Sequence, residues 1–78
     1  MTKYKTKQQI CNKLIILSDS IENGKLIFTY DSEKDYFDVI IYNKINIGMF
    51  ATLVYVNKPN IEETFERIEE IITFINND

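Results

Sequence analysis

The stretch YFDVIIYNKINIGMFATLVYV, from Tyr36 to Val56, decides the fold of this chain. It is dense in β-branched and aromatic residues, which favour pleated strands. The polar pair Asn43-Lys44 interrupts the apolar run. We therefore expect two strands, about Tyr36–Tyr42 and Ile45–Val56, joined by a tight turn at the centre of a small antiparallel sheet. Gly48 is a candidate bulge or bend in the long second strand.

A helix is expected to begin at Thr6, before this sheet. Thr6 and Gln9 have the spacing of a capping box, in which each residue satisfies a backbone amide of the other. Apolar residues then recur at helical spacing and form one stripe, which Cys11 and Ile15 widen: Ile10, Leu14, Leu17 and Ile21. We expect Asn23-Gly24 to stop this helix, with glycine in the left-handed conformation.

A first strand is expected from Lys25 to Asp31, because apolar and aromatic residues alternate there. The polar residues 31–35 then form a turn of hairpin-loop length. After Pro59, Asn60 is a candidate N-cap with Glu63 at the N3 position. A second helix should follow from Ile61 to Ile75, with one apolar stripe: Ile61, Phe65, Ile68, Ile72 and Ile75.

The order of elements is α-β-β-β-α, which predicts a single α+β domain spanning residues 1–78 with a flexible start at residues 1–5. We expect two layers: a three-stranded antiparallel meander and both helices packed on one of its faces. In one register Phe37, Val39 and Ile41 point toward the helices, and an inverted register, which would swap the two faces of the sheet, is left open. The opposite face of the sheet then has no cover within the monomer.

No pattern in the sequence indicates catalysis, and we expect neither an enzyme nor a cofactor. Cys11 is the only cysteine and the chain has no histidine, so a nucleophilic thiol would lack its usual base. Cys11 is better explained as a small buried hydrophobe. Residues 31–35 lack the glycine and distal glutamate of a calcium loop. No metal site is predicted.

The charge is unevenly distributed along the chain, and this bears on nucleic-acid binding. Residues 1–25 carry a net charge of +3, whereas residues 59–78 carry −5 and the whole chain −3. Overall acidity argues against nucleic acid as a partner, because neutralisation of phosphates dominates that affinity. One alternative is an acidic mimic of nucleic acid, whose surface would be the polar face of the second helix: Glu62, Glu66, Glu69 and Glu70.

Composition also suggests a setting for the protein. Isoleucine, asparagine and lysine supply 30 of the 78 residues, and their AT-rich codons favour a low-GC bacterium, a phage or another mobile element. A lone cysteine fits a reducing compartment. The apolar run 14–17 is far too short for a membrane span, so we expect a cytoplasmic protein without membrane contact.

The uncovered sheet face is the main candidate for function. Pleating sends the residues that alternate with Phe37, Val39 and Ile41 to the other side. The predicted binding patch on that side is Tyr36, Asp38, Ile40, Tyr42 and Tyr55. The neighbouring strands are expected to add residues such as Ile27, Thr29 and Met49. Tyrosines around an isoleucine are typical of a contact surface. We expect a protein-binding module, an inhibitor or regulator, with a homo-oligomer paired through the same face as the alternative.

Overall fold

The structure is a computed structural model, and it describes residues 6–44, 48–56 and 58–77. Its order of elements is the predicted α-β-β-β-α, an α+β fold. The expected loose start at residues 1–5 lies outside the described residues. The elements are α1 (Lys7–Asp19), β1 (Gly24–Asp31), β2 (Tyr36–Asn43), β3 (Gly48–Tyr55) and α2 (Ile61–Asn76).

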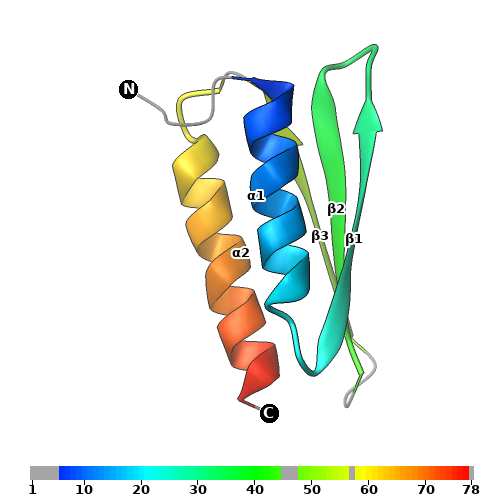
Figure 1. Ribbon diagram of the computed structural model, residues 1–78, viewed down its shortest axis with the longest axis vertical. Coiled ribbons are helices and arrows are strands. Elements are labelled where there is room, and N and C mark those ends of the chain that lie inside the picture. The colour runs from blue at the N-terminus through cyan, green and yellow to red at the C-terminus, as the bar shows by residue number, and fades with distance from the viewer. Residues whose placement is uncertain (1–5, 45–47, 57, 78) are drawn as a thin grey trace.

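The strands form an antiparallel meander in the order β1-β2-β3, and both helices lie on the same side of it (Figure 1). α1 packs on β1, and α2 packs on β3. This is the predicted two-layer arrangement. β2 is the central strand, so β1 and β3 are the two edges of the sheet.

The hydrophobic core lies between the helices and the sheet. Phe37, Val39 and Ile41 are buried, which decides between the two registers left open by the sequence, and the Phe37 ring packs against the rings of Phe28 and Tyr30 at centroid distances of 6.0 and 5.0 Å. Among the described residues no polar or charged side chain is buried. Within the described residues, the buried apolar side chains are those of Ile10, Leu14, Leu17, Leu26, Phe37, Val39, Ile41, Val54, Ile61, Phe65, Ile68, Ile72 and Ile75.

The predicted capping box begins α1. The Thr6 hydroxyl accepts a hydrogen bond from the Gln9 amide at 3.2 Å, and Gln9 Oε1 accepts one from the Thr6 amide at 3.1 Å. The predicted end of this helix is wrong. α1 ends at Asp19, where the amide and hydroxyl of Ser20 both bond to the Leu17 carbonyl. Gly24 does not have a positive φ and instead begins β1.

Two asparagines join the α1–β1 connection to the end of α2. Asn76 Oδ1 accepts hydrogen bonds from the amides of Glu22 (2.8 Å) and Asn23 (3.4 Å), and its Nδ2 donates to the Ser20 carbonyl (2.9 Å). Asn23 Nδ2 donates in return to the carbonyls of Ile75 and Asn76, at 3.3 and 3.2 Å. These bonds satisfy the carbonyls that a helix leaves free at its C-terminus.

Asn76→Ala is expected to lower the free energy of unfolding by about 1–2 kcal/mol, because it removes three hydrogen bonds to the backbone of Ser20, Glu22 and Asn23, of which the bond to Asn23 is partly buried. Urea denaturation of the two proteins measures the loss. Asn77→Ala is the matched control, since Asn77 is exposed and should shift stability by less than about 0.5 kcal/mol. Equal effects of the two changes would refute the role given to Asn76.

The turn between β1 and β2 is held by its own acidic residues. Asp31 Oδ1 accepts from the amides of Glu33 (3.0 Å) and Lys34 (3.2 Å), and Asp35 adopts a left-handed conformation with φ of 56°. The Tyr30 hydroxyl donates to the Asp35 carboxylate. This bond and the negative charge of Asp35 raise the pKa of Tyr30 above its usual value.

The described part of β3 pairs with β2 in a regular antiparallel ladder. Asn43 pairs with Gly48, and β3 spans Gly48–Tyr55. The predicted start at Ile45 falls on residues 45–47, outside the described part of the chain. The ladder runs without a break from Gly48, its first residue, to Tyr55, and a bulge or bend between Gly48 and the residues before it would lie outside the described part of the chain.

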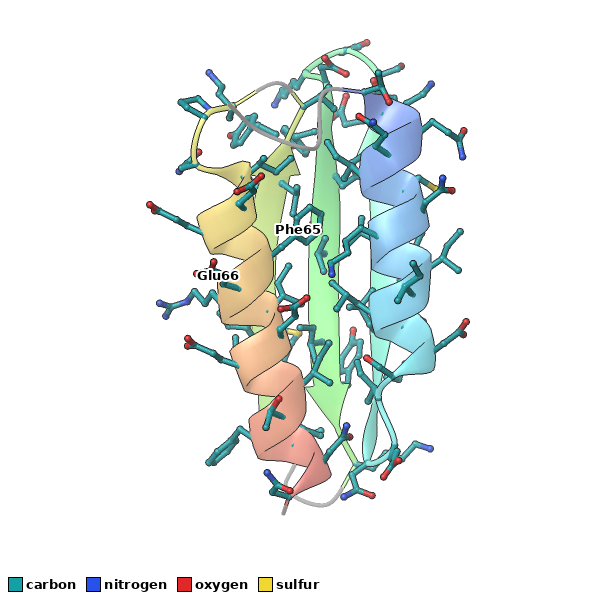
Figure 2. The ribbon with its side chains drawn as sticks, turned by 60° about the vertical axis from the view of Figure 1, so that its left-hand side comes forward. Phe65 and Glu66 are labelled. Atoms are coloured by element: carbon teal, nitrogen blue, oxygen red, sulfur yellow. The ribbon has the colours of Figure 1, made fainter. Side chains whose placement is uncertain are left out.

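α2 begins where predicted, although Asn60 caps it differently. The Asn60 side chain makes no capping hydrogen bond, and its carbonyl accepts from the Thr64 amide at 3.2 Å. All five residues of the predicted apolar stripe are buried. Figure 2 shows Phe65 on the side of α2 that faces the sheet and Glu66 on its outer side.

Candidate functional site

The sheet face turned away from the helices is the candidate site, and we call it the open face. Its residues follow from the strand registers, because every second residue of each strand points to that side. The open face consists of Lys25, Ile27, Thr29 and Asp31 from β1, Tyr36, Asp38, Ile40 and Tyr42 from β2, and Met49, Ala51, Leu53 and Tyr55 from β3.

The structure brings together all five residues that the sequence predicted for this patch. Tyr36 lies directly opposite Tyr55 across the β2–β3 ladder, and Asp38, Ile40 and Tyr42 follow along the same side of β2. The additional residues named from sequence, such as Ile27, Thr29 and Met49, share this face.

Large apolar side chains remain accessible on the open face. Met49 is 66% exposed, and four others are each about two-fifths exposed: Ile27, Tyr42, Leu53 and Tyr55. Single exposed apolar residues are common on protein surfaces, but a contiguous group of them is a feature of interaction sites. Tyr42 stands opposite Met49 and diagonal to Ile27, and Leu53 precedes Tyr55 on the same face of β3. The paired residues Ile40 and Ala51 lie between these two sets and join them into one apolar group.

One end of the open face is aromatic. The rings of Tyr36 and Tyr55 pack edge to face, with centroids 5.3 Å apart and planes at 75°. The ammonium of Lys58 lies 5.9 Å from the centre of the Tyr55 ring. Because each ring restrains the other, the two tyrosines offer a surface that loses little side-chain entropy on binding.

The other end of the open face is hollow and basic. Lys25, Ile27, Tyr42 and Lys44 line an open depression of about 300 Å³. Two ammonium groups beside an isoleucine and a tyrosine suit an apolar side chain with a carboxylate nearby. Asp31 and Asp38 lie farther along the face, so its charges are of both signs.

The sequence prediction omitted Ala51 and Leu53, which also lie on the open face. The signal was present, because both alternate with Val54 along β3 in the same way as Tyr55. The predicted strand ran back to Ile45, and this obscured which residues of β3 stand opposite Ile40 and Asp38. The register places Ala51 beside Ile40 and Leu53 beside Asp38.

The acidic face of α2, the alternative site, is partly committed to internal contacts. Glu66 and Glu70 are exposed, whereas Glu69 forms an ion pair with Lys13 of α1 at 2.7 Å. Glu62 is half-buried at the first turn, where a carboxylate suits the helix dipole. The four predicted glutamates therefore do not present a uniform anionic surface.

Chemistry-bearing groups are sparse in the described part of the chain. Cys11 is a free thiol, half-buried, and packs against the core. Among residues 6–44, 48–56 and 58–77, no group of three or more Cys, Asp or Glu side chains is placed to hold a metal ion. None of the described helices is long and apolar enough to cross a membrane.

Comparison with known proteins adds no relative from which a role could be transferred. No family model, no curated protein and no solved structure matches this chain.

Proposed function

We propose that this protein is a non-enzymatic binding module that acts stoichiometrically on another protein through its open face. The observation that carries the proposal is the continuous group of exposed apolar side chains on a rigid sheet: Ile27, Tyr42, Met49, Leu53 and Tyr55. The composition and the single cysteine place it, in this proposal, in the cytoplasm as an inhibitor or regulator carried by a phage or mobile element of a low-GC bacterium.

Physical reasons favour a protein over a small molecule as the ligand. Small molecules bind in concave sites that bury most of their surface, whereas the open face is a pleated surface with one open depression at its end. Tyrosine, methionine and leucine on a flat surface suit a partner that contributes its own apolar side chains. Such a partner covers several strands at once.

The charges on the open face describe the partner further. Lys25 and Lys44 flank the depression, so the complementary surface should carry a carboxylate there. Asp38 lies near the middle of β2, between Thr29 and Leu53. Its carboxylate should accept a hydrogen bond from a partner side chain such as Arg or Tyr. Charges of this kind set orientation and specificity more than affinity.

The double change Tyr36→Ala with Tyr42→Ser tests the proposal. Partner affinity is expected to fall at least 100-fold, because buried interface tyrosines contribute about 2 kcal/mol or more each. Affinity purification from the host extract identifies the partner, and calorimetry with the purified partner measures the loss. Circular dichroism checks that the double variant stays folded, as the exposure of Tyr42 predicts.

Charge reversal of Glu62, Glu66 and Glu70 is the matched control on the other face of the molecule. The proposal requires that this variant binds the partner normally. If charge reversal abolishes binding and the tyrosine changes do not, the protein acts as an acidic mimic through α2. If the only species captured by the open face is a second copy of this chain, the homo-oligomer explanation holds instead.

A further inference from the structure

The edge strand β3 has an unusual composition for an exposed edge. Its sequence from Gly48 to Tyr55, GMFATLVY, contains neither a charged residue nor a proline. Natural edge strands usually carry such residues, because they prevent pairing with another chain. The opposite edge, β1, does carry Lys25 and Asp31. The absence of protection on β3 is therefore specific to one side of the sheet.

Two hydrogen bonds at the ends of the ladders fix which backbone groups of β3 face outward. The Lys44 amide bonds to the Asn23 carbonyl at 2.9 Å, and the Val56 amide bonds to the Asp35 carbonyl at 3.1 Å. In an antiparallel ladder, bonded and non-bonded pairs alternate. The backbone N–H of Val56 points toward β2, so the backbone groups of every second residue before it, from Val54 back to Gly48, do the same. The N–H and C=O groups that point away from β2 are therefore those of Met49, Ala51, Leu53 and Tyr55.

These four outward residues are self-complementary under a two-fold axis at Thr52. An antiparallel pair of β3 strands centred there sets Met49 opposite the partner's Tyr55, and Ala51 opposite the partner's Leu53. All four outward residues of each copy then form backbone hydrogen bonds with outward residues of the other copy. Shifting the register by one pair of residues leaves some of these backbone groups without a hydrogen-bond partner. We propose that two copies of this chain pair through β3 into one continuous six-stranded sheet.

Side chains fit this register on both faces of the sheet. On the open face a small residue meets a large one, Ala51 with the partner's Leu53, and the Met49 thioether meets the partner's Tyr55 ring. On the helix side Thr52 meets the partner's Thr52, a cross-strand pair whose hydroxyls can bond to each other. No like charges face each other, since the strand has none.

The outer flank of α2 supplies a second, independent observation. Phe74 is 70% exposed, and it lies two helical turns from Arg67, whose guanidinium is 5.8 Å above the ring of Phe50 in β3. Residues seven positions apart share a helix face. Phe74 therefore lies on the β3 side of α2, where pairing of the edges brings the two α2 helices toward each other.

The pairing goes beyond the proposed function and does not depend on it. It would place the two open faces side by side on one sheet. A single three-stranded face of eight-residue strands measures about 27 by 14 Å. Two of them reach the area of a standard protein interface more readily than one.

Sedimentation velocity from about 1 µM to 1 mM tests the proposal with two variants of the full chain. Ala51→Pro removes an outward N–H without touching the bonds to β2, and an edge position whose N–H faces solvent tolerates proline. Ile40→Lys alters the open face on the central strand and leaves the edge intact. The wild type and Ile40→Lys are expected to dimerise, whereas Ala51→Pro stays monomeric at every concentration.

Amide hydrogen exchange decides the case even if a variant fails to fold. In wild type, protection of the Met49, Ala51, Leu53 and Tyr55 amides should rise at least tenfold from dilute to concentrated samples, while the already bonded Val54 amide changes less. A monomer at 1 mM overturns the proposal, as does a dimer whose edge amides stay unprotected. Loss of the dimer in Ile40→Lys but not in Ala51→Pro would mean that the copies pair face to face.

Discussion

Phe65→Ala is expected to lower the free energy of unfolding by about 3–5 kcal/mol, the usual cost of deleting a buried phenylalanine. The Phe65 side chain is 2% exposed and lies in the layer between α2 and the sheet (Figure 2). The loss combines the transfer of the ring to water with the cavity that remains. In a domain of 78 residues this is a large part of the total stability.

Phe74→Ala is the matched control, because it removes the same side chain from the same helix. Phe74 is 70% exposed, so the expected change is within about 0.5 kcal/mol for the monomer. Both variants should be measured by urea denaturation at a low protein concentration, at which association does not contribute. A loss below about 1 kcal/mol for Phe65→Ala would show that the apolar stripe of α2 does not face the core.

The helices and the alternation of the strands were predictable because their signals are local. The stripe of α2 repeats at the helical period, and all five of its residues are buried. The alternation along β2 similarly separates Phe37, Val39 and Ile41 from the other face, but only their burial in the structure shows that this set faces the helices. Once that parity is known, pleating assigns the open face of β2 without further information.

Features that depend on distant residues were not predictable. Asn76 bonds to Glu22 and Asn23, more than fifty positions away, and nothing near Asn23 in the sequence indicates such a partner. The pairing of Asn43 with Gly48 is a property of the folded sheet.

The candidate site was predicted in part for the same reason. Alternation located Tyr36, Asp38, Ile40 and Tyr42, but the residues beside them on β1 and β3 depend on register. Which backbone N–H and C=O groups of β3 point away from β2 depends on which residue pairs of the ladder are hydrogen-bonded, and no local pattern of side chains encodes that. The chemistry of a partner is a property of two surfaces, and one sequence specifies only one of them.

Gly24 illustrates a correct residue choice with a different physical cause, and its substitution is the second large effect that we expect. The sequence suggested that glycine serves a left-handed helix end, but Gly24 has no positive φ. A Cβ atom added at Gly24 would lie 2.1 Å from the carbonyl oxygen of Tyr42 and 3.3 Å from the Ile21 side chain. Glycine is needed because β1 begins in close contact with the backbone of β2.

Gly24→Ala is therefore expected to lower the free energy of unfolding by about 1–3 kcal/mol, the range for forcing extra atoms into a packed site. The obstacle is a backbone oxygen, so relief requires the first pairs of the β1–β2 ladder to separate, Gly24 from Asn43 and Lys25 from Tyr42. Lys25→Ala is the control, because the neighbouring residue is exposed and already carries a Cβ.

The sign of the change in the free energy of unfolding shows whether the close approach of Gly24 to β2 excludes a side chain or whether this position accepts one. At a position that accepts a side chain, replacing glycine by alanine stabilises a protein by about 0.4–1 kcal/mol, because the unfolded chain loses freedom. A gain of that size in urea denaturation would contradict the close approach of Gly24 to Tyr42. If Gly24→Ala loses stability and Lys25→Ala stays near wild type, the steric contact between the strands outweighs the gain from the reduced freedom of the unfolded chain.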